Sequence, residues 1–280
     1  MRSAADFFGR DATPLYEKRL WLLDMDGTIY EESRLFDGVL AFLRIVRERE
    51  SDYMFITNNS SKSVKDYVRK VSSMGIPADE GDFFTSTQAT AMYLRRHSQD
   101  GLVYVQGTES MVRELNSLGI RTVQAFDSRI SAVVLGFDTE LTSRKLRTTC
   151  ECLTRLDVPF IATNPDAVCP VSFGFVPDCG SIAGMIQNAT GRKPLFIGKP
   201  APEMLLCAME SRGMDRERTV FVGDRLYTDI AAAKNAMVDS VLVLTGETKE
   251  GDLAASTVQP GYVFSDIQSL GSVLQGGVNV

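Results

Sequence analysis

The chain alternates between short, continuously apolar runs and longer stretches whose apolar residues recur at helical spacing. Residues 20–23 (LWLL) and 219–222 (TVFV) are examples of the short runs, which indicate strands buried on both faces. Residues 39–49, by contrast, carry apolar side chains three or four positions apart, as in an amphipathic helix. Strands that alternate with helices in this way predict an α/β protein with a parallel sheet.

The same pattern predicts the remaining elements. We expect strands at residues 20–23, 53–56, 102–105, 132–135, 158–161, 195–197, 219–222 and 241–244. We expect helices at residues 39–49, 63–74, 88–96, 109–118, 143–156, 202–211, 227–235 and 266–274, and another that begins at residue 181. A complete second set of strands and helices therefore lies in the middle of the chain.

Composition limits the class of protein. The 280 residues have a hydrophobic fraction of 44%, a charged fraction of 24% and a formal net charge of −6, which argues for a globular protein and against a general nucleic-acid binder. No apolar run approaches the length of a membrane span or a signal peptide, so we expect a cytoplasmic protein. The five cysteines have no CxxC spacing and indicate reduced thiols. The single histidine, His97, follows Arg95 and Arg96 at an expected exposed helix end, which argues against a His metal site and against a Ser–His triad.

Two carboxylates follow the first predicted strand directly, in the sequence LLDMDGT. Residues i and i+2 of a strand point the same way, so Asp24 and Asp26 would face one crevice if strand geometry continues that far. The simpler interpretation is an acidic turn before the next element. An EF-hand loop is disfavoured, because it needs an acid six residues after Gly27, where Ser33 stands.

Three further polar segments follow predicted strands. Residues 57–61 (TNNSS) offer small donors that suit an anion, or else cap the helix that follows. Lys199 precedes a proline-started helix and, taken alone, fits a solvated surface charge. Residues 223–229 (GDRLYTD) place carboxylates at a strand end and in a first helical turn, which suits capping and metal binding equally. All of these segments lie at strand ends, where open parallel α/β sheets bind ligands.

In this order, DxDGT, TNN, GKP and GDxxxxD resemble the four motifs of phosphatases of the haloacid dehalogenase (HAD) superfamily. The large α/β stretch between the second and third motifs is similar to the large-cap (class IIA) subgroup of NagD-like or para-nitrophenylphosphatase-like proteins. ATNPD at residues 162–166 and GRKPLFIGKPAPEM at residues 191–204 also resemble this subgroup. The resemblance covers nearly the whole chain. It implies a Rossmann-like, doubly wound parallel-sheet HAD core at residues 1–85 and 180–280, with an inserted α/β cap domain at residues 86–179.

The resemblance implies a magnesium-dependent hydrolase of small phosphate monoesters, such as nucleotide, sugar or glycolate phosphates, with para-nitrophenyl phosphate as a generic substrate. Asp24 would attack phosphorus to form an aspartyl-phosphate. Asp26 would protonate the leaving alcohol and later take a proton from water.

The resemblance also implies a set of binding residues. The phosphate-binding residues would be Thr57, Asn58, Asn59 and Lys199. The Mg²⁺ ligands would be Asp24, the main-chain carbonyl of Asp26, and Asp224, with Asp229 as an outer-shell partner. The expected partner is a small phosphorylated metabolite, with neither nucleic acid nor membrane, and the sequence is compatible with a homo-oligomer.

Other functions on the same fold need a different set of residues. A dehalogenase would need neither Asp26 nor Asp224. A mutase with its cap after the first motif lacks room, because only about thirty residues separate Thr28 from Thr57, enough for one βαβ crossover. A non-catalytic phosphometabolite-binding or sensor protein is the remaining alternative, although such a protein has little need of a proton donor at Asp26.

Overall fold

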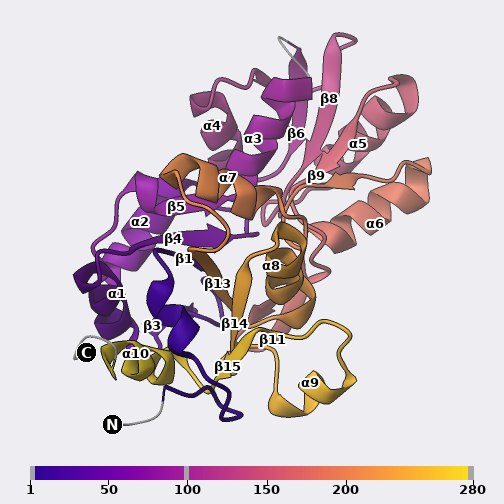
Figure 1. Cartoon of the computed structure of the whole chain (residues 1–280). Helices are drawn as coiled ribbons and strands as arrows, with labels where there is room; N and C mark the ends of the chain where they lie inside the picture. The colour runs from indigo at the N-terminus through magenta and orange to yellow at the C-terminus, as the bar shows by residue number, and fades with distance from the viewer. Residues whose placement is uncertain (1–3, 98–100, 277–280) are drawn as a thin grey trace. The chain divides into compact units, whose positions relative to one another are not determined.

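The computed structural model describes residues 4–97 and 101–276. The described chain divides into two compact units, each with its own parallel sheet (Figure 1). The core unit comprises Met1–Thr57, Val68–Phe84 and Lys199–Val280, and the cap unit comprises Asn58–Tyr67 and Thr85–Gly198. The predicted α/β class with parallel sheets is confirmed.

The core unit contains a six-stranded sheet in the order β15-β14-β13-β1-β4-β5. Its strands are β1 (Leu20–Leu23), β4 (Asp52–Thr57), β5 (Phe83–Thr85), β13 (Thr219–Gly223), β14 (Asp239–Val243) and β15 (Tyr262–Phe264). All four side chains of β1 are buried, and β1 pairs in parallel with β13 on one side and β4 on the other. The chain fills the β4 side first and returns later to the β13 side. Strand order therefore reverses between β1 and β13, which is where open α/β sheets bind ligands.

Helices cover both faces of the core sheet. They are α1 (Val39–Glu48), α2 (Val64–Ser73), α7 (Glu203–Arg212), α8 (Ala231–Ala236), α9 (Glu250–Ala255) and α10 (Ile267–Gly276). The short elements are η1 (Thr13–Glu17), η2 (Glu80–Asp82), η3 (Leu226–Ile230) and the hairpin of β2 (Tyr30–Glu31) and β3 (Arg34–Leu35). Helices α1 and α10 pack together on one face, and α7 and α8 pack together on the other (Figure 1).

The cap unit contains a five-stranded sheet in the order β12-β9-β8-β6-β7 and an antiparallel hairpin, β10-β11. Its strands are β6 (Leu102–Gln106), β7 (Thr122–Val123), β8 (Ile130–Leu135), β9 (Phe160–Ala162), β10 (Val168–Val171), β11 (Gly174–Pro177) and β12 (Leu195–Phe196). Its helices are α3 (Ser86–His97), α4 (Glu109–Ser117), α5 (Ser143–Arg155) and α6 (Cys179–Thr190). None of the helices in the described part of the chain is long and apolar enough to span a membrane.

The second boundary of the cap unit differs from the sequence expectation. We expected the cap to end at residue 179, but the unit extends to Gly198. Helix α6 buries Ile182, Ala183 and Ile186 in the apolar core of this unit, and β12 pairs with β9. A two-residue strand has too little sequence signal to reveal its partner, and pairing decides which sheet it joins.

The helix expected at residues 227–235 also opens differently. The main-chain N–H groups of Asp229 and Ile230 both bond to the carbonyl of Arg225, which makes the first turn, η3, a wider π-type turn. Such turns are frequent at functional sites. Here the turn directs the carboxylate of Asp229 back toward the end of β13, where it accepts hydrogen bonds from the main chain of Asp224 and Arg225.

Candidate active site

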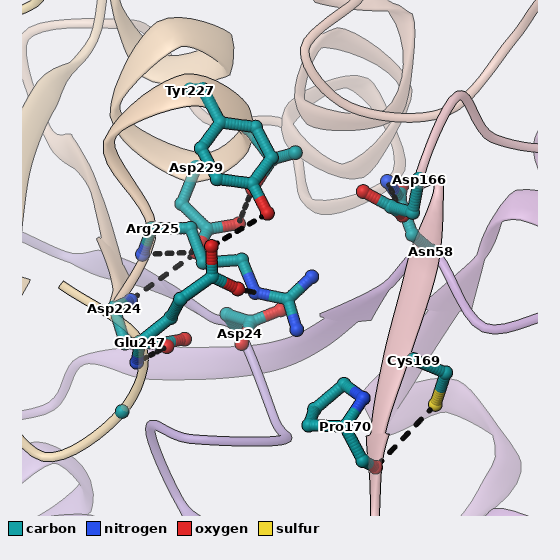
Figure 2. Close-up of polar contacts among 12 residues, drawn as sticks. Asp24, Asn58, Asp166, Cys169, Pro170, Asp224, Arg225, Tyr227, Asp229 and Glu247 are labelled. Atoms are coloured by element: carbon teal, nitrogen blue, oxygen red, sulfur yellow. Dashed lines mark hydrogen bonds and ion pairs between the residues drawn. The ribbon is translucent and has the colours of Figure 1, made fainter. Parts of the chain in front are cut away.

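The end of the core sheet brings together three buried carboxylates. Asp24 follows β1, Asp224 follows β13, and Asp229 lies in η3 (Figure 2). One oxygen from each lies within 4.8 Å of the others. These residues are far apart in sequence and meet because β1 and β13 are neighbours at the reversal of strand order. We call Asp24, Asp224 and Asp229 the carboxylate cluster.

Lys199 enters the carboxylate cluster just before α7. Its ammonium donates to Oδ1 of Asp24 at 2.5 Å and to Oδ1 of Asp229 at 2.7 Å, and the residue is only 2% exposed. Burial alone would lower the pKa of Lys199, but the charges of Asp229 and Asp24 outweigh it and raise that pKa. Lys199 is therefore a buried, charged residue and not the solvated surface lysine that its local sequence suggested.

The carboxylate cluster carries more negative charge than Lys199 offsets. Burial, with the charge of Asp229, raises the pKa of Asp24 well above its ordinary value, although Lys199 opposes the shift. The same two causes raise the pKa of Asp224 to about 6. Burial and mutual repulsion disfavour the ionised form of these two carboxyl groups. A cation bound beside them would offset the repulsion and would therefore be stabilised.

One main-chain group and one side-chain hydroxyl contact the carboxylate of Asp224. Its Oδ2 accepts the N–H of Glu247 at 2.7 Å, and its Oδ1 lies 3.3 Å from the hydroxyl of Thr28. A Cβ added at Gly246 would lie 1.9 Å from the same Oδ2, and one at Gly27, whose φ is +92°, would lie 2.6 Å from it. Only glycine permits this approach, so the DGT motif and the loop after β14 together form the walls around this carboxylate.

Asp26 has a separate set of partners. The strand ends at Leu23, and the carbonyl of Met25 closes a turn by accepting three main-chain N–H groups, so the i, i+2 rule does not extend to Asp26. The Asp26 carboxylate accepts the hydroxyl of Tyr30 at 3.3 Å and lies 3.6 Å from the ammonium of Lys70, which also sits 3.6 Å above the Tyr30 ring. Its side chain is 42% exposed, so solvent can reach it.

The TNN segment is divided between the two units. Thr57 ends β4 and is buried in the core unit. In the cap unit, the side-chain amide of Asn58 donates to Oδ2 of Asp166 at 2.9 Å. The side-chain oxygen of Asn59 accepts both the N–H and the hydroxyl of Ser61, a local turn before α2. The cap of α2 is instead Ser63, whose hydroxyl accepts the N–H of Asp66 at 3.2 Å. For Asn58, phosphate binding would therefore use the main-chain N–H rather than the side chain.

Comparisons with known proteins show the family to which the chain belongs. The profile of haloacid dehalogenase-like hydrolases matches residues 21–121, and an HAD-hydrolase-like profile matches residues 196–270. An acid sugar phosphatase of Staphylococcus saprophyticus is 32% identical over 252 residues, 90% of this chain and 96% of the relative. The chain belongs to the haloacid dehalogenase-like hydrolase family.

Solved structures of HAD-like hydrolases share the whole fold. A 4-nitrophenylphosphatase from Thermotoga maritima superposes with a TM-score of 0.88 at 38% identity, covering 94% of this chain and 99% of that one. A glycerol phosphate phosphatase from Mycobacterium tuberculosis, solved in complex with magnesium, has a TM-score of 0.85 at 30% identity and covers 92% and 78%. The expected resemblance to the NagD-like and nitrophenylphosphatase subgroup is confirmed, and with it a hydrolase of phosphoric monoester bonds.

The carboxylate cluster of this HAD-like hydrolase suits a hard divalent cation. Carboxylate oxygens are the ligands that Mg²⁺ prefers, and a buried group of three offers more charge than a lysine can balance. Asp229 is the least available of the three, because Lys199 occupies its Oδ1 and the main chain of Asp224 and Arg225 occupies its Oδ2. The outer-shell role expected for Asp229 stays a prediction.

Sequence reasoning missed several residues at the edge of this site. Arg225 lies within the GDxxxxD motif as an unspecified position, and its Nε lies 3.1 Å from Oε2 of Glu247. The hydroxyl of Tyr227 donates to the other oxygen of Glu247 at 2.8 Å (Figure 2). Burial alone would lower the pKa of Arg225, but Asp224 and its neighbours raise it. No sequence signal marks Glu247, because it follows a different strand from its partners.

Proposed function

We propose that this HAD-like hydrolase cleaves small phosphate monoesters through an aspartyl-phosphate on Asp24, with Mg²⁺ as cofactor. The observation that carries the proposal is the buried carboxylate cluster with Lys199 at the reversal of strand order. A carboxylate nucleophile that attacks an anionic phosphate needs cationic charge beside it, and Lys199 with a divalent cation would supply that charge.

In the first step, an oxygen of Asp24 attacks phosphorus and the bond from phosphorus to the leaving oxygen breaks. Asp26 gives its proton to that oxygen, and its exposed carboxyl group leaves room for the leaving alcohol. In the second step, water attacks the same phosphorus, Asp26 takes the proton of this water, and the bond to Asp24 breaks to release phosphate. Lys199 stays protonated throughout and holds Asp24 in place.

Mg²⁺ would be held by Asp24, Asp224 and the main-chain carbonyl of Asp26, and when bound it would screen the negative charge of carboxylate and phosphate from each other. Asp229 would act from outside by orienting Lys199. Thr57 and the main chain of Asn58 are the proposed donors to the phosphoryl oxygens, and Asn59 would support the turn that carries them. The substrates are small phosphorylated metabolites, for which the named activities of the relatives on sugar and glycerol phosphates provide the first candidates.

A panel of phosphorylated metabolites and para-nitrophenyl phosphate, assayed with Mg²⁺ and with EDTA, tests the proposed reaction. We expect hydrolysis that depends on Mg²⁺. Asp24→Asn should form no phosphoenzyme with any substrate, because the nucleophile is gone. Turnover that survives in Asp24→Asn would overturn the assignment.

Asp26→Asn should lose about a hundred- to ten-thousand-fold with an alkyl phosphate and much less in the first step with an aryl phosphate, whose phenolate leaves without a proton. A rapid-mix time course with both substrates should then show a burst of nitrophenol followed by slow turnover. Equal losses of phosphoenzyme formation on the two substrates would contradict the acid–base role. Asp37→Asn, the same change at an exposed residue of the following loop, is the matched control and should behave as wild type.

A further inference from the structure

The segment ATNPD at residues 162–166 has no role in the proposed reaction, yet its side chains contact the TNN segment. Within the cap unit, Asp166 accepts the side-chain amide of Asn58 at 2.9 Å (Figure 2), and the hydroxyl of Thr163 lies 2.9 Å from that of Ser60. Asn58 and Asp166 are 8% and 6% exposed, and Thr163 and Ser60 are fully buried. Two successive pairs of side chains therefore join the loop after β9 to the segment that follows β4.

The cap unit holds Asp166 firmly from the other side. The same Oδ2 that accepts Asn58 also accepts the side-chain amide of Asn164 at 2.9 Å. Asn164 donates in turn to Oδ1 of Asp178, the N-cap residue of α6, at 3.2 Å. The main-chain carbonyl of Asp166 accepts the N–H of Gly180 at 2.8 Å. Asp166 is thus fixed to the start of a helix through both its main chain and its side chain.

Asn58 is held by its main chain as well as by its side chain. Its main-chain carbonyl accepts the hydroxyl of Ser86 at 2.6 Å. Glycine at position 198 leaves space for its side-chain oxygen, because a Cβ there would lie only 2.6 Å from that oxygen. Hydrogen bonds at the main-chain carbonyl and at the side-chain amide therefore hold Asn58 on both sides of its Cα. They restrict the backbone of Asn58, including the preceding peptide, which carries the main-chain N–H proposed above to bind phosphate.

We infer that Asp166 is a positioning residue, which sets the phosphate-binding segment through the side chain of Asn58. The inference rests on the proposed function, because it assumes that the segment binds phosphate. Loss of Asp166 should therefore weaken the binding of the phosphoryl group itself, whatever the leaving group. A residue that contacted the leaving group would instead alter the KM of esters and leave the affinity for inorganic phosphate unchanged.

Calorimetric titration with inorganic phosphate in the presence of Mg²⁺ tests the inference without turnover. Asp166→Ala should weaken phosphate binding about tenfold or more, because a hydrogen bond to a buried charged group is lost and Asn58 is released. Asp166→Asn keeps an oxygen at the same place and should stay within about threefold of wild type. Asp166→Ser keeps a polar group but is too short to reach Asn58, so it should show the loss of Asp166→Ala and serves if that variant does not fold.

Two controls separate positioning from general destabilisation. Asp138→Ala removes another buried carboxylate of the cap unit, one that is 3% exposed and bonded to Lys145. It should lower the melting temperature and leave the phosphate affinity of the folded protein unchanged. In an Asn58→Ala background, Asp166→Ala should add little to the loss, because its partner is already gone.

The outcomes distinguish this inference from the proposed function. Wild-type affinity for phosphate in folded Asp166→Ala, or fully additive losses in the Asn58→Ala background, would overturn the inference alone. A wild-type protein that binds phosphate but hydrolyses no ester would refute the proposed turnover, and the binding ratios would still decide the role of Asp166. A wild-type protein that does not bind phosphate would overturn both.

Discussion

Replacement of Lys199 by methionine tests the electrostatics of the carboxylate cluster most directly. The change removes an ammonium that is 2% exposed and bonded to Asp24 at 2.5 Å and to Asp229 at 2.7 Å, while methionine keeps most of the volume. Removing one partner of a buried ion pair costs about 3–5 kcal/mol, because the remaining charges stay buried without compensation. We expect a loss of this size in the metal-free protein near neutral pH.

The loss should depend on pH in a defined direction. The pKa of Lys199 is raised above its unfolded value of 10.5. Its contribution to stability is therefore complete below pH 10.5 and is lost only at higher pH, so this contribution does not change near neutral pH. The pKa of Asp24 is raised as well, and that of Asp224 is raised from 3.8 to about 6. The contribution of these two carboxyl groups to the stability of the fold is therefore complete below pH 3.8, and it disappears as the pH rises through their pKa values in the folded protein. Without Lys199, both carboxylates would take up protons more readily, so the loss of stability should be smaller at about pH 5 than at about pH 7.5.

Urea unfolding in EDTA, followed by circular dichroism and by the fluorescence of the single, buried Trp21, measures this loss at both pH values. Addition of Mg²⁺ should restore part of it. Lys145→Met is the matched control, because it removes an ion pair with Asp138 at 2.9 Å in the cap unit, and Mg²⁺ should restore none of its stability. A loss below about 1 kcal/mol, or an equal loss at both pH values, would refute the reasoning.

Further predictions concern the metal site. Mg²⁺ should raise the melting temperature of the wild type more at about pH 7.5 than at about pH 5, because ligands must be ionised and the pKa of Asp224 is about 6; equal shifts would contradict this. Asp224→Asn should reduce the shift without destabilising the protein in EDTA, since it removes one of the repelling charges. Gly246→Ala should abolish most of the shift and lower turnover about tenfold, because its Cβ would lie 1.9 Å from Asp224. Gly251→Ala, where a Cβ meets nothing within 4 Å, should be neutral or stabilising by about 0.5–1 kcal/mol.

The sequence predicted the features that depend on neighbouring residues. The unbroken apolar run of β1 and the helical spacing of α1 are local patterns, and both elements form where they were expected. The polar motifs could be assigned to strand ends for the same reason, because a strand end is visible as the point where an apolar run stops. The resemblance to the HAD motifs then suggested the roles proposed for Asp24 and Asp224, which spacing alone left open.

The contacts between segments were decided only by the tertiary structure. By its local sequence alone Lys199 was indistinguishable from a surface lysine, and the core sheet places Asp24 and Asp229 beside it. The resemblance placed the strand expected at residues 195–197 in the core, whereas pairing with β9 assigns β12 to the cap unit. The same holds for Asp166 and Asn58, whose hydrogen bond joins residues 108 positions apart. The periodicity of apolar residues shows which face of a segment is buried. It does not show which other segment covers that face, because this depends on packing between residues far apart in the sequence.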